Sequence, residues 1–312
     1  MASISKCLLP PLAIVAALAA TATVPAVAPP DPDFVVAYWR FEEGIPDTRA
    51  TGPNSILDSS EHKLHGTPIN APVYRANIAA KAIPQADARN SLSLELNGAN
   101  QRIFVPDDTL FHLTKNLTVE AWINVRSNTP SGSNAQILFR GDDRPGLDPY
   151  FLAVQGNKLA FSVQNATNHS AAVIAPLPGL NQWIHVAGTL DDASGEIRLY
   201  INGASAAQLV TAIRPLGALD PTQNPGIGIG GLQSAGQYFN GLIDEIRISS
   251  RALHPDRFLN ANSTREPKPG LTTRWSGHVL AFWFFEADRP RNASPSSNGF
   301  PAGSARAAHR ER

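Results

Sequence analysis

Apolar and polar residues alternate along three segments that lie far apart in the chain, 117–125, 183–190 and 241–249. A period of two is typical of a β-strand with one buried face, and all three segments are rich in β-branched and aromatic residues. A fourth alternating segment, 196–201, runs into Asn202 and Gly203, a residue pair typical of tight turns. The pattern predicts a protein built mainly from sheets.

Shorter alternating segments predict further strands between these four. A Gly-Asn pair at 156–157 and an Asn-Gly pair at 97–98 each separate two such segments, and both predict β-hairpins. Single helical turns are expected only at 107–113 and 254–259. Many short strands joined by turns favour an all-β fold in which two antiparallel sheets pack face to face, a β-sandwich of the jelly-roll type.

Composition narrows the class of protein without changing this fold. The chain of 312 residues has 26 basic and 26 acidic side chains, so nothing favours a nucleic-acid binder. The single cysteine, Cys7, lies in the N-terminal apolar region and would be lost with a leader peptide. A mature chain without a thiol could form no disulfide, no thiolate nucleophile and no cysteine-ligated zinc site.

The N-terminus reads as an export signal over residues 1–28. Lys6 precedes an apolar run at 8–20, and several small-x-small patterns that suit cleavage follow. An uncleaved membrane anchor is the alternative, but the apolar region is short for a span and is broken at Pro10, Pro11 and Pro25. We therefore expect a secreted protein with no membrane insertion after signal cleavage.

The C-terminal residues 263–312 are rich in Arg, Pro, Ser and Ala and predict a flexible basic tail. The apolar patch at 279–285 does not fit a simple disordered segment. An extra strand, a docking segment and sequence foreign to the domain all stay open as explanations.

Seven phrases of the sequence fall in a fixed order, at 38–44, 58–60 with 65–66, 94–98 with 103–106, 117–123, 183–187, 199–203 and 241–248. Together they resemble the laminin-G-like, concanavalin A-type jelly-roll family, in particular the accessory domains of secreted bacterial proteins. The resemblance implies a jelly-roll domain over 34–262. It implies less about function, because this fold hosts many unrelated binding roles.

The resemblance also implies calcium, which many members of the family bind. Calcium takes several hard oxygen ligands, often carboxylates together with main-chain carbonyls. The candidate ligands are Asp58 in a polar loop, Asp244 in a late strand, and Asn97 and Gly98 in their turn. The alternative is that Asp244 pairs with a nearby arginine and that water solvates the loop acids.

Candidates for ligand binding come from loops and strand ends. Tyr150 and Tyr238 lie near loops and are the expected stacking residues for sugar rings, because the tryptophans at 39, 122 and 183 fall in alternating strands and are expected in the core. Arg144 and Asn168 lie in loops and carry side chains that could hydrogen-bond a ligand. None of these four positions forms a specific motif.

Catalysis is not expected. A glycoside hydrolase needs two carboxylates across a cleft, and some hydrolases with this sandwich carry them in a Glu-x-Asp-x-x-Glu string that this sequence lacks. Glu120 and Glu245 lie on different predicted strands among apolar residues. The sequence thus predicts a secreted, non-catalytic module that recognises carbohydrate or a cell-surface protein. A structural or adhesion module and an unrecognised glycoside hydrolase are the alternatives.

Overall fold

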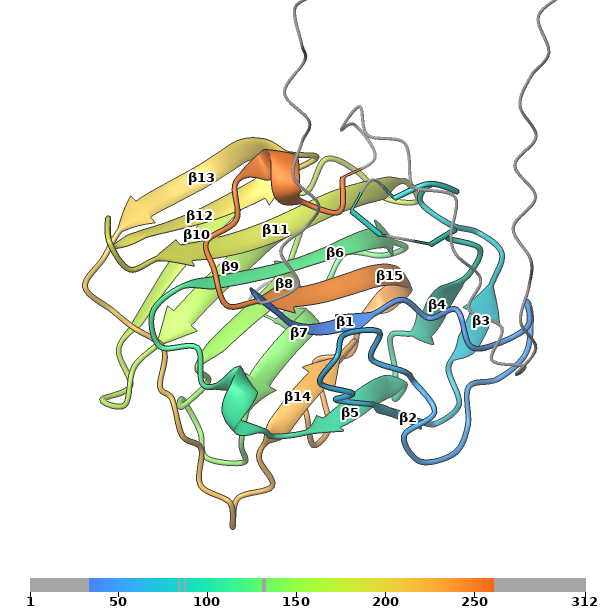
Figure 1. Cartoon of the computed structure of the whole chain (residues 1–312), viewed down its shortest axis with the longest axis horizontal. Helices are drawn as coiled ribbons and strands as arrows, with labels where there is room; N and C mark the ends of the chain where they lie inside the picture. The colour runs from blue at the N-terminus through green and yellow to red at the C-terminus, as the bar shows by residue number, and fades with distance from the viewer. Residues whose placement is uncertain (1–33, 84, 87, 131–132, 261–312) are drawn as a thin grey trace, which may run out of the picture. The chain divides into compact units, whose positions relative to one another are not determined.

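Two antiparallel sheets account for nearly all regular structure in the part of the chain that is described (Figure 1). The computed structural model describes residues 34–83, 85–86, 88–130 and 133–260. The predicted leader, 1–28, and the predicted flexible basic tail, 263–312, both lie outside the described residues. The prediction of an antiparallel β-sandwich is confirmed.

The first sheet has eight strands in the order β13-β12-β11-β6-β15-β4-β3, with β1 also paired to β15. Their bounds are β1 (Val35–Trp39), β3 (Val73–Arg75), β4 (Ser93–Asn97), β6 (Leu117–Val125), β11 (Trp183–Asp191), β12 (Glu196–Ile201), β13 (Ala204–Val210) and β15 (Asn240–Ser249). The three long alternating segments of the sequence become β11, β6 and β15, which are neighbours at the centre of this sheet.

The second sheet has seven strands in the order β10-β9-β8-β7-β14-β5-β2. Their bounds are β2 (Thr67–Ile69), β5 (Arg102–Pro106), β7 (Asn134–Gly141), β8 (Tyr150–Gln155), β9 (Lys158–Gln164), β10 (Ser170–Pro176) and β14 (Gly226–Ile229). The predicted hairpin at 156–157 is confirmed, because Gln155 pairs with Lys158 across a two-residue loop. The predicted helical turns are short 3-10 turns, η2 (Thr109–Phe111) and η3 (Pro255–Arg257).

The hairpin predicted at 97–98 is wrong. β4 pairs with β15 and β3, whereas β5 pairs with β14 and β2, so this turn carries the chain from one sheet to the other. Asn97 Oδ1 accepts the backbone N–H groups of the three residues at 99–101, and Gly98 supplies a φ of +69°. An Asn-Gly pair reverses the chain, but the buried faces of the strands decide which strands pair.

The core lies between the sheets and is built from the inward-facing residues of the alternating strands. In β6 the residues Leu117, Val119, Ala121, Ile123 and Val125 all belong to this core. Full burial of a large aliphatic side chain contributes about 1.5–3 kcal/mol relative to exposure. The core therefore supplies the main stabilisation of a domain that has no disulfide in its described part.

The outer face of the eight-stranded sheet is covered by the segment 250–260, so every residue of β6 is buried. Phe258 packs in one cluster with Phe34, and Leu259 packs in another with Trp122, whose indole N–H donates to the Leu259 carbonyl. Sequence periodicity predicts only one buried face for this strand. The second buried face results from tertiary contacts with residues more than a hundred positions away.

The sheet edges at β10 and β13 carry no charged residue. Each strand has a single neighbour in the described part, and each exposes large apolar side chains: Ile174 is 44% exposed, Leu209 43% and Val210 72%. Natural edge strands are usually protected by charges, proline or bulges. Of these devices β10 has a proline at its end, Pro176, and β13 has a bulge near Leu199 and Tyr200 of its partner strand.

Candidate functional site

Several loops meet where β5 and β7 end and β14 begins. Pro106 and Gly141 both pair with Gly226, which brings the following segments to one end of the seven-stranded sheet. We call this region the loop end and define it by residues 107–116, 142–149, 165–169 and 211–225.

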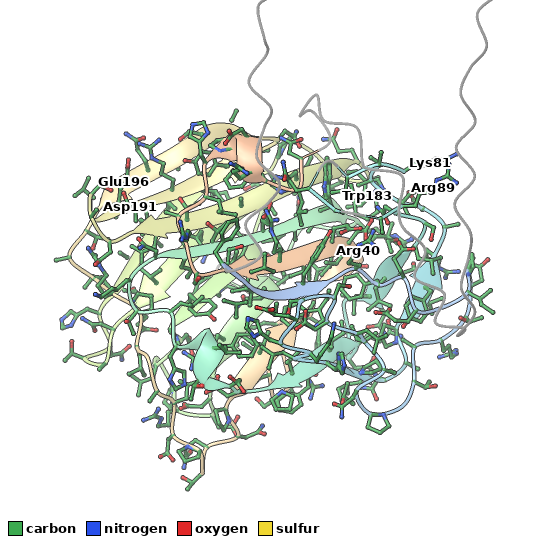
Figure 2. The ribbon with its side chains drawn as sticks, in the orientation of Figure 1. Arg40, Lys81, Arg89, Trp183, Asp191 and Glu196 are labelled. Carbon is green, nitrogen blue, oxygen red and sulfur yellow. The ribbon has the colours of Figure 1, made fainter. Side chains whose placement is uncertain are left out.

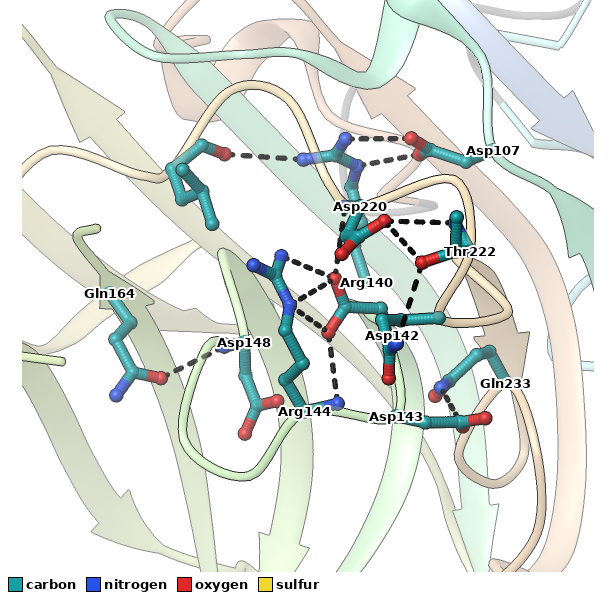
Figure 3. A network of polar contacts seen from close by, with 12 residues as sticks. Asp107, Arg140, Asp142, Asp143, Arg144, Asp148, Gln164, Asp220, Thr222 and Gln233 are labelled. Atoms are coloured by element: carbon teal, nitrogen blue, oxygen red, sulfur yellow. Dashed lines mark hydrogen bonds and ion pairs between the residues drawn. The ribbon is translucent and has the colours of Figure 1, made fainter. Parts of the chain in front are cut away.

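A buried ion pair forms the base of the loop end (Figure 3). The guanidinium of Arg140 is fully buried and donates from Nε and Nη2 to the two carboxylate oxygens of Asp107, at 3.0 and 3.1 Å. Its Nη1 donates to the Leu216 carbonyl at 3.2 Å. Paired, parallel bonds of this kind fix both side chains, so the base is rigid and joins β7 to two of the loops.

A second ion pair joins the loop after β7 to the loop before β14. Arg144 Nε lies 3.0 Å from each carboxylate oxygen of Asp142, which also accepts the backbone N–H of Asp220 at 3.2 Å. Burial raises the pKa of Asp142, but the bonds from Arg144 and from backbone N–H groups outweigh this and hold the pKa below its usual value. Arg144 Nη1 forms no hydrogen bond within the described residues.

Asp148 presents an unusual carboxylate beside this pair. Its backbone N–H donates to Gln164 at 3.0 Å, but its carboxylate accepts no hydrogen bond in the described part of the chain. Burial, together with the nearby charge of Asp142, raises the pKa of Asp148 to about 6. The carboxylate is therefore mostly ionised at neutral pH and keeps free acceptor capacity.

The structure brings two of the four predicted ligand residues together. Arg144 lies in the β7–β8 loop, and Asn168 in the β9–β10 loop packs so closely on Gly146 that an added Cβ would lie 2.6 Å from its Oδ1. Tyr238 lies elsewhere, in the β14–β15 connection, where the preceding residue Gln237 accepts the backbone N–H of Gln136 near the start of β7. The predicted set is thus divided between opposite ends of β7.

Tyr150 is not available for stacking. Its side chain is fully buried, and its hydroxyl donates to the Phe111 carbonyl at 3.2 Å. The guanidinium of Arg140 lies 5.9 Å from the ring centroid. The expectation that a sugar ring stacks on Tyr150 is therefore corrected: this residue supports the base of the loop end from below.

A pocket of about 220 Å³ opens beside Asp107, lined by Asn54, Lys63, Leu64, His65, Val105, Pro106, Asp107 and Asp108. The wall at 63–65 is held by Asp58, whose Oδ2 accepts the Leu64 N–H at 2.8 Å and whose own N–H donates to His65 Nδ1 at 2.9 Å. Lys63 and Asn54 have φ angles of +56° and +54°. Such conformations in non-glycine residues cost energy and are held only by the surrounding structure.

The residues predicted to bind calcium do not fit a common site. Asp58 accepts four hydrogen bonds from backbone and hydroxyl groups of residues 38, 60 and 64, and the side-chain oxygen of Asn97 is used by three backbone N–H groups. Gly98 packs against Asn240 in the same turn as Asn97. In the described part of the chain no three His, Cys, Asp or Glu side chains are grouped so as to hold a metal ion.

Asp244 is fully buried on β15 and does not pair with an arginine. Its Oδ2 accepts the side-chain N–H of Asn90 at 2.7 Å, while its Oδ1 and the Asn90 Oδ1 have no partner in the described chain. Burial raises the pKa of Asp244 well above its usual value, and the nearby Glu42 adds to the rise while Arg40 opposes it. The buried environment therefore favours the neutral form of this carboxyl group.

The two strand carboxylates, Glu120 and Glu245, are also fully buried. Glu120 accepts hydrogen bonds from Arg247, His185 and the Leu259 N–H, and Glu245 pairs with Arg40 at 2.9 Å. All of these bonds are internal. Neither carboxylate can flank a scissile glycosidic bond in this arrangement.

A second polar surface lies on the side of the eight-stranded sheet that carries segment 77–90 (Figure 2). Trp183 is half-buried there and donates its indole N–H to Asn77 at 2.9 Å. Lys81 and Arg89 are exposed nearby, and Arg40 donates to the Arg89 carbonyl at 3.0 Å. Of the three tryptophans in the described residues, Trp39 and Trp122 are buried, and Trp183 alone is partly exposed to solvent.

Sequence reasoning missed Asp148, Lys63 and Asn54. Asp148 stands in the loop directly before Pro149, which has no backbone N–H to donate, and this residue pair is a usable signal. Lys63 and Asn54 carry no such signal, because their left-handed backbone conformations and their common pocket depend on contacts between distant loops.

Three solved structures are similar to this chain, two of them with TM-scores above 0.5. The receptor-binding domain of botulinum neurotoxin C/D mosaic serotype has a TM-score of 0.51 and 14% identity, over 72% of this chain and 50% of that one. The binding domain of serotype G has a TM-score of 0.51 and 12% identity, over 71% and 49%. Domain 4 of a GH43 extracellular arabinanase from Geobacillus stearothermophilus, in complex with arabinotriose, has a TM-score of 0.48 and 20% identity, over 72% and 95%.

This chain therefore spans about half the length of the neurotoxin domains that it matches. No curated protein sequence matches it. In the described residues no helix is long and apolar enough to cross a membrane.

A laminin G-like family model, described as the concanavalin A-like lectin/glucanases superfamily, matches residues 97–257, which is more than half of the chain. The chain belongs to this laminin G-like family of the concanavalin A-like superfamily.

Proposed function

We propose that this protein is a secreted, non-catalytic domain that recognises carbohydrate through its loop end. The observation that carries the proposal is the free hydrogen-bonding capacity gathered there on a rigid base. Asp148 offers an acceptor without a donor, and Arg144 Nη1 and the side-chain amide of Asn168 offer donors. Sugar hydroxyls both donate and accept, so a mixed set of fixed polar groups suits them.

The buried state of Glu120 and Glu245 supports binding over catalysis. Glycoside hydrolysis needs one carboxyl group as acid and a second as base or nucleophile on either side of the bond. Both glutamates are used in internal ion pairs instead. Secretion is part of the proposal because the leader over residues 1–28 is a sequence prediction.

Retention on insoluble polysaccharides and binding to a glycan array test this function with the full chain. Asp148→Asn removes the free carboxylate and should weaken retention at least about tenfold, since hydrogen bonds to charged groups are the stronger ones. Asp256→Asn is the matched control, because Asp256 is an exposed aspartate on η3 whose carboxylate pairs with His254 at the surface. Loss in Tyr238→Ala with unchanged binding in Asp148→Asn would move the site to the β14–β15 connection.

Adhesion through protein contacts is the second candidate function. It is favoured by the uncharged edges of β10 and β13, which expose Ile174, Leu209 and Val210. Pull-down of cell-surface proteins that fails when Val210 is replaced by lysine, together with no retention on any glycan, would favour this role over carbohydrate recognition.

A further inference from the structure

The pocket beside Asp107 is distinct from the group around Asp148, and its free polar atoms are mainly donors. Both oxygens of Asp107 are already used, by Arg140 at 3.0 and 3.1 Å and by His112 at 3.5 Å. The charge of this carboxylate is therefore compensated from below. It does not set the charge preference of the pocket.

The tautomer of His65 follows from its contact with Asp58. A backbone N–H can only donate, so His65 Nδ1 must accept it, and the proton of a neutral ring is on Nε2. Nε2 has no partner within the described residues. His65 lines the pocket, and its Nε2–H is therefore a free donor there. The loop at 58–66 fixes the orientation of the ring.

Lys63 and Asn54 add further donors. The ammonium group of Lys63 forms no ion pair in the described chain, and the side-chain amide of Asn54 forms no hydrogen bond there. The backbone around them is fixed: His65 N–H donates to the Lys63 carbonyl at 2.9 Å, and Asn54 N–H donates to Thr67 at 3.0 Å. The donors are mounted on loops that are already ordered, which lowers the entropic cost of binding.

Asp108 completes the set with one acceptor. Its Oδ1 accepts the Leu110 N–H at 2.9 Å as the cap of η2, which leaves Oδ2 free. A ligand that suits the pocket therefore presents an anionic acceptor to Lys63 and His65 and a hydroxyl donor to Asp108. A pocket of about 220 Å³ is smaller than the usual ~300–1,000 Å³ of ligand sites, so it admits one small unit of a longer chain.

We infer that this pocket binds the carboxylate-bearing sugar unit, a uronic acid, of an acidic glycan. The inference rests on the proposed carbohydrate function and adds the class of sugar. The carboxylate accepts from Lys63 and from His65 Nε2, and ring hydroxyls bond with Asp108 and Asn54. Val105 and Leu64 provide the apolar part of the lining against the C–H face of the ring.

Titration calorimetry and NMR with the full chain test it, using oligogalacturonate, neutral galactose oligomers of equal length, and acetate. Oligogalacturonate should bind saturably, and more weakly as salt rises. Lys63→Gln should weaken this binding about tenfold or more, whereas Lys158→Gln, which removes an exposed lysine at the start of β9, should leave it unchanged.

His65→Asn separates binding from folding. The Asn side-chain oxygen can still accept the Asp58 N–H, but the Nε2 donor is lost. Weaker oligogalacturonate binding at an unchanged melting temperature is the expected result.

Equal binding of acetate and oligogalacturonate would overturn the inference and leave an adventitious anion site. Binding of neutral polysaccharide without binding of oligogalacturonate would overturn it while the proposed carbohydrate function stands. If no glycan of either kind binds, both fall.

Discussion

We expect replacement of Glu120 to lower the free energy of unfolding strongly. It is fully buried, and its carboxylate accepts from Arg247 Nε at 2.7 Å, from His185 Nε2 at 2.8 Å and from the Leu259 N–H at 2.8 Å. Arg247 is 2% exposed, so Glu120→Gln leaves its positive charge in the interior without its ion-pair partner. Removal of one partner from a buried pair costs about 3–5 kcal/mol.

For a domain of this size, each kcal/mol lowers the melting temperature by about 2–4 °C. We therefore expect Glu120→Gln to melt about 6–20 °C below the wild-type protein in thermal and denaturant unfolding. Hydrogen exchange at the Leu259 amide should also accelerate, because this carboxylate holds the segment 250–260 on the sheet. The matched control is Glu196→Gln, whose partner Arg198 is 38% exposed and whose loss should cost at most about 1 kcal/mol.

The expected pH dependence follows from the same contacts. Burial raises the pKa of Glu120, but Arg247 and His185 outweigh it and hold the pKa below its usual value. This carboxylate therefore stabilises the fold above its unfolded pKa of about 4.3, and the contribution is lost as the pH falls through the folded value. A Glu120→Gln variant as stable as Glu196→Gln would refute the reasoning, since the buried charge of Arg247 would then cost nothing.

Three further changes have defined outcomes. Asp58→Ala leaves several buried donors unpaired and should lower the unfolding free energy by about 3 kcal/mol in calcium and in chelator alike; a loss confined to calcium would contradict this. The raised folded pKa of Asp244 means that stability falls as pH rises above about 4, and Asp244→Asn should flatten this part of the pH–stability curve. Tyr150→Phe should cost about 1 kcal/mol in denaturant unfolding and leave glycan retention unchanged; loss of retention would contradict the buried position of the ring.

Local patterns were sufficient to predict most strands and the two-sheet fold. The alternation in β6, β11 and β15 depends only on residues within each segment, and these strands are neighbours in the structure. Partner choice was harder to predict, because the Asn97–Gly98 turn fits a hairpin as well as a crossing between sheets. The outward residues of β6 gave no sign that segment 250–260 would bury them.

The candidate site was predictable only in part, for the same reason. Arg144 and Asn168 were correctly expected in loops, but nothing local distinguishes Tyr150, which is buried, from Tyr238, which is half-buried. Asp58 looks like a metal ligand because it is an acid in a polar loop. The fold brings four hydrogen-bond donors to the Asp58 carboxylate, and these bonds hold the loop at 58–66 in place.

The first and last parts of the described domain meet on one face. Phe34 packs with Leu253 and Phe258, and its carbonyl accepts the Ser250 N–H at 2.8 Å. The chain therefore enters and leaves the sandwich at neighbouring points. A domain with this geometry can be inserted into a surface loop of another protein, or repeated along a longer chain, without distortion of the protein that receives it. This geometry makes the domain a portable unit that carries its loop end unchanged into a new protein.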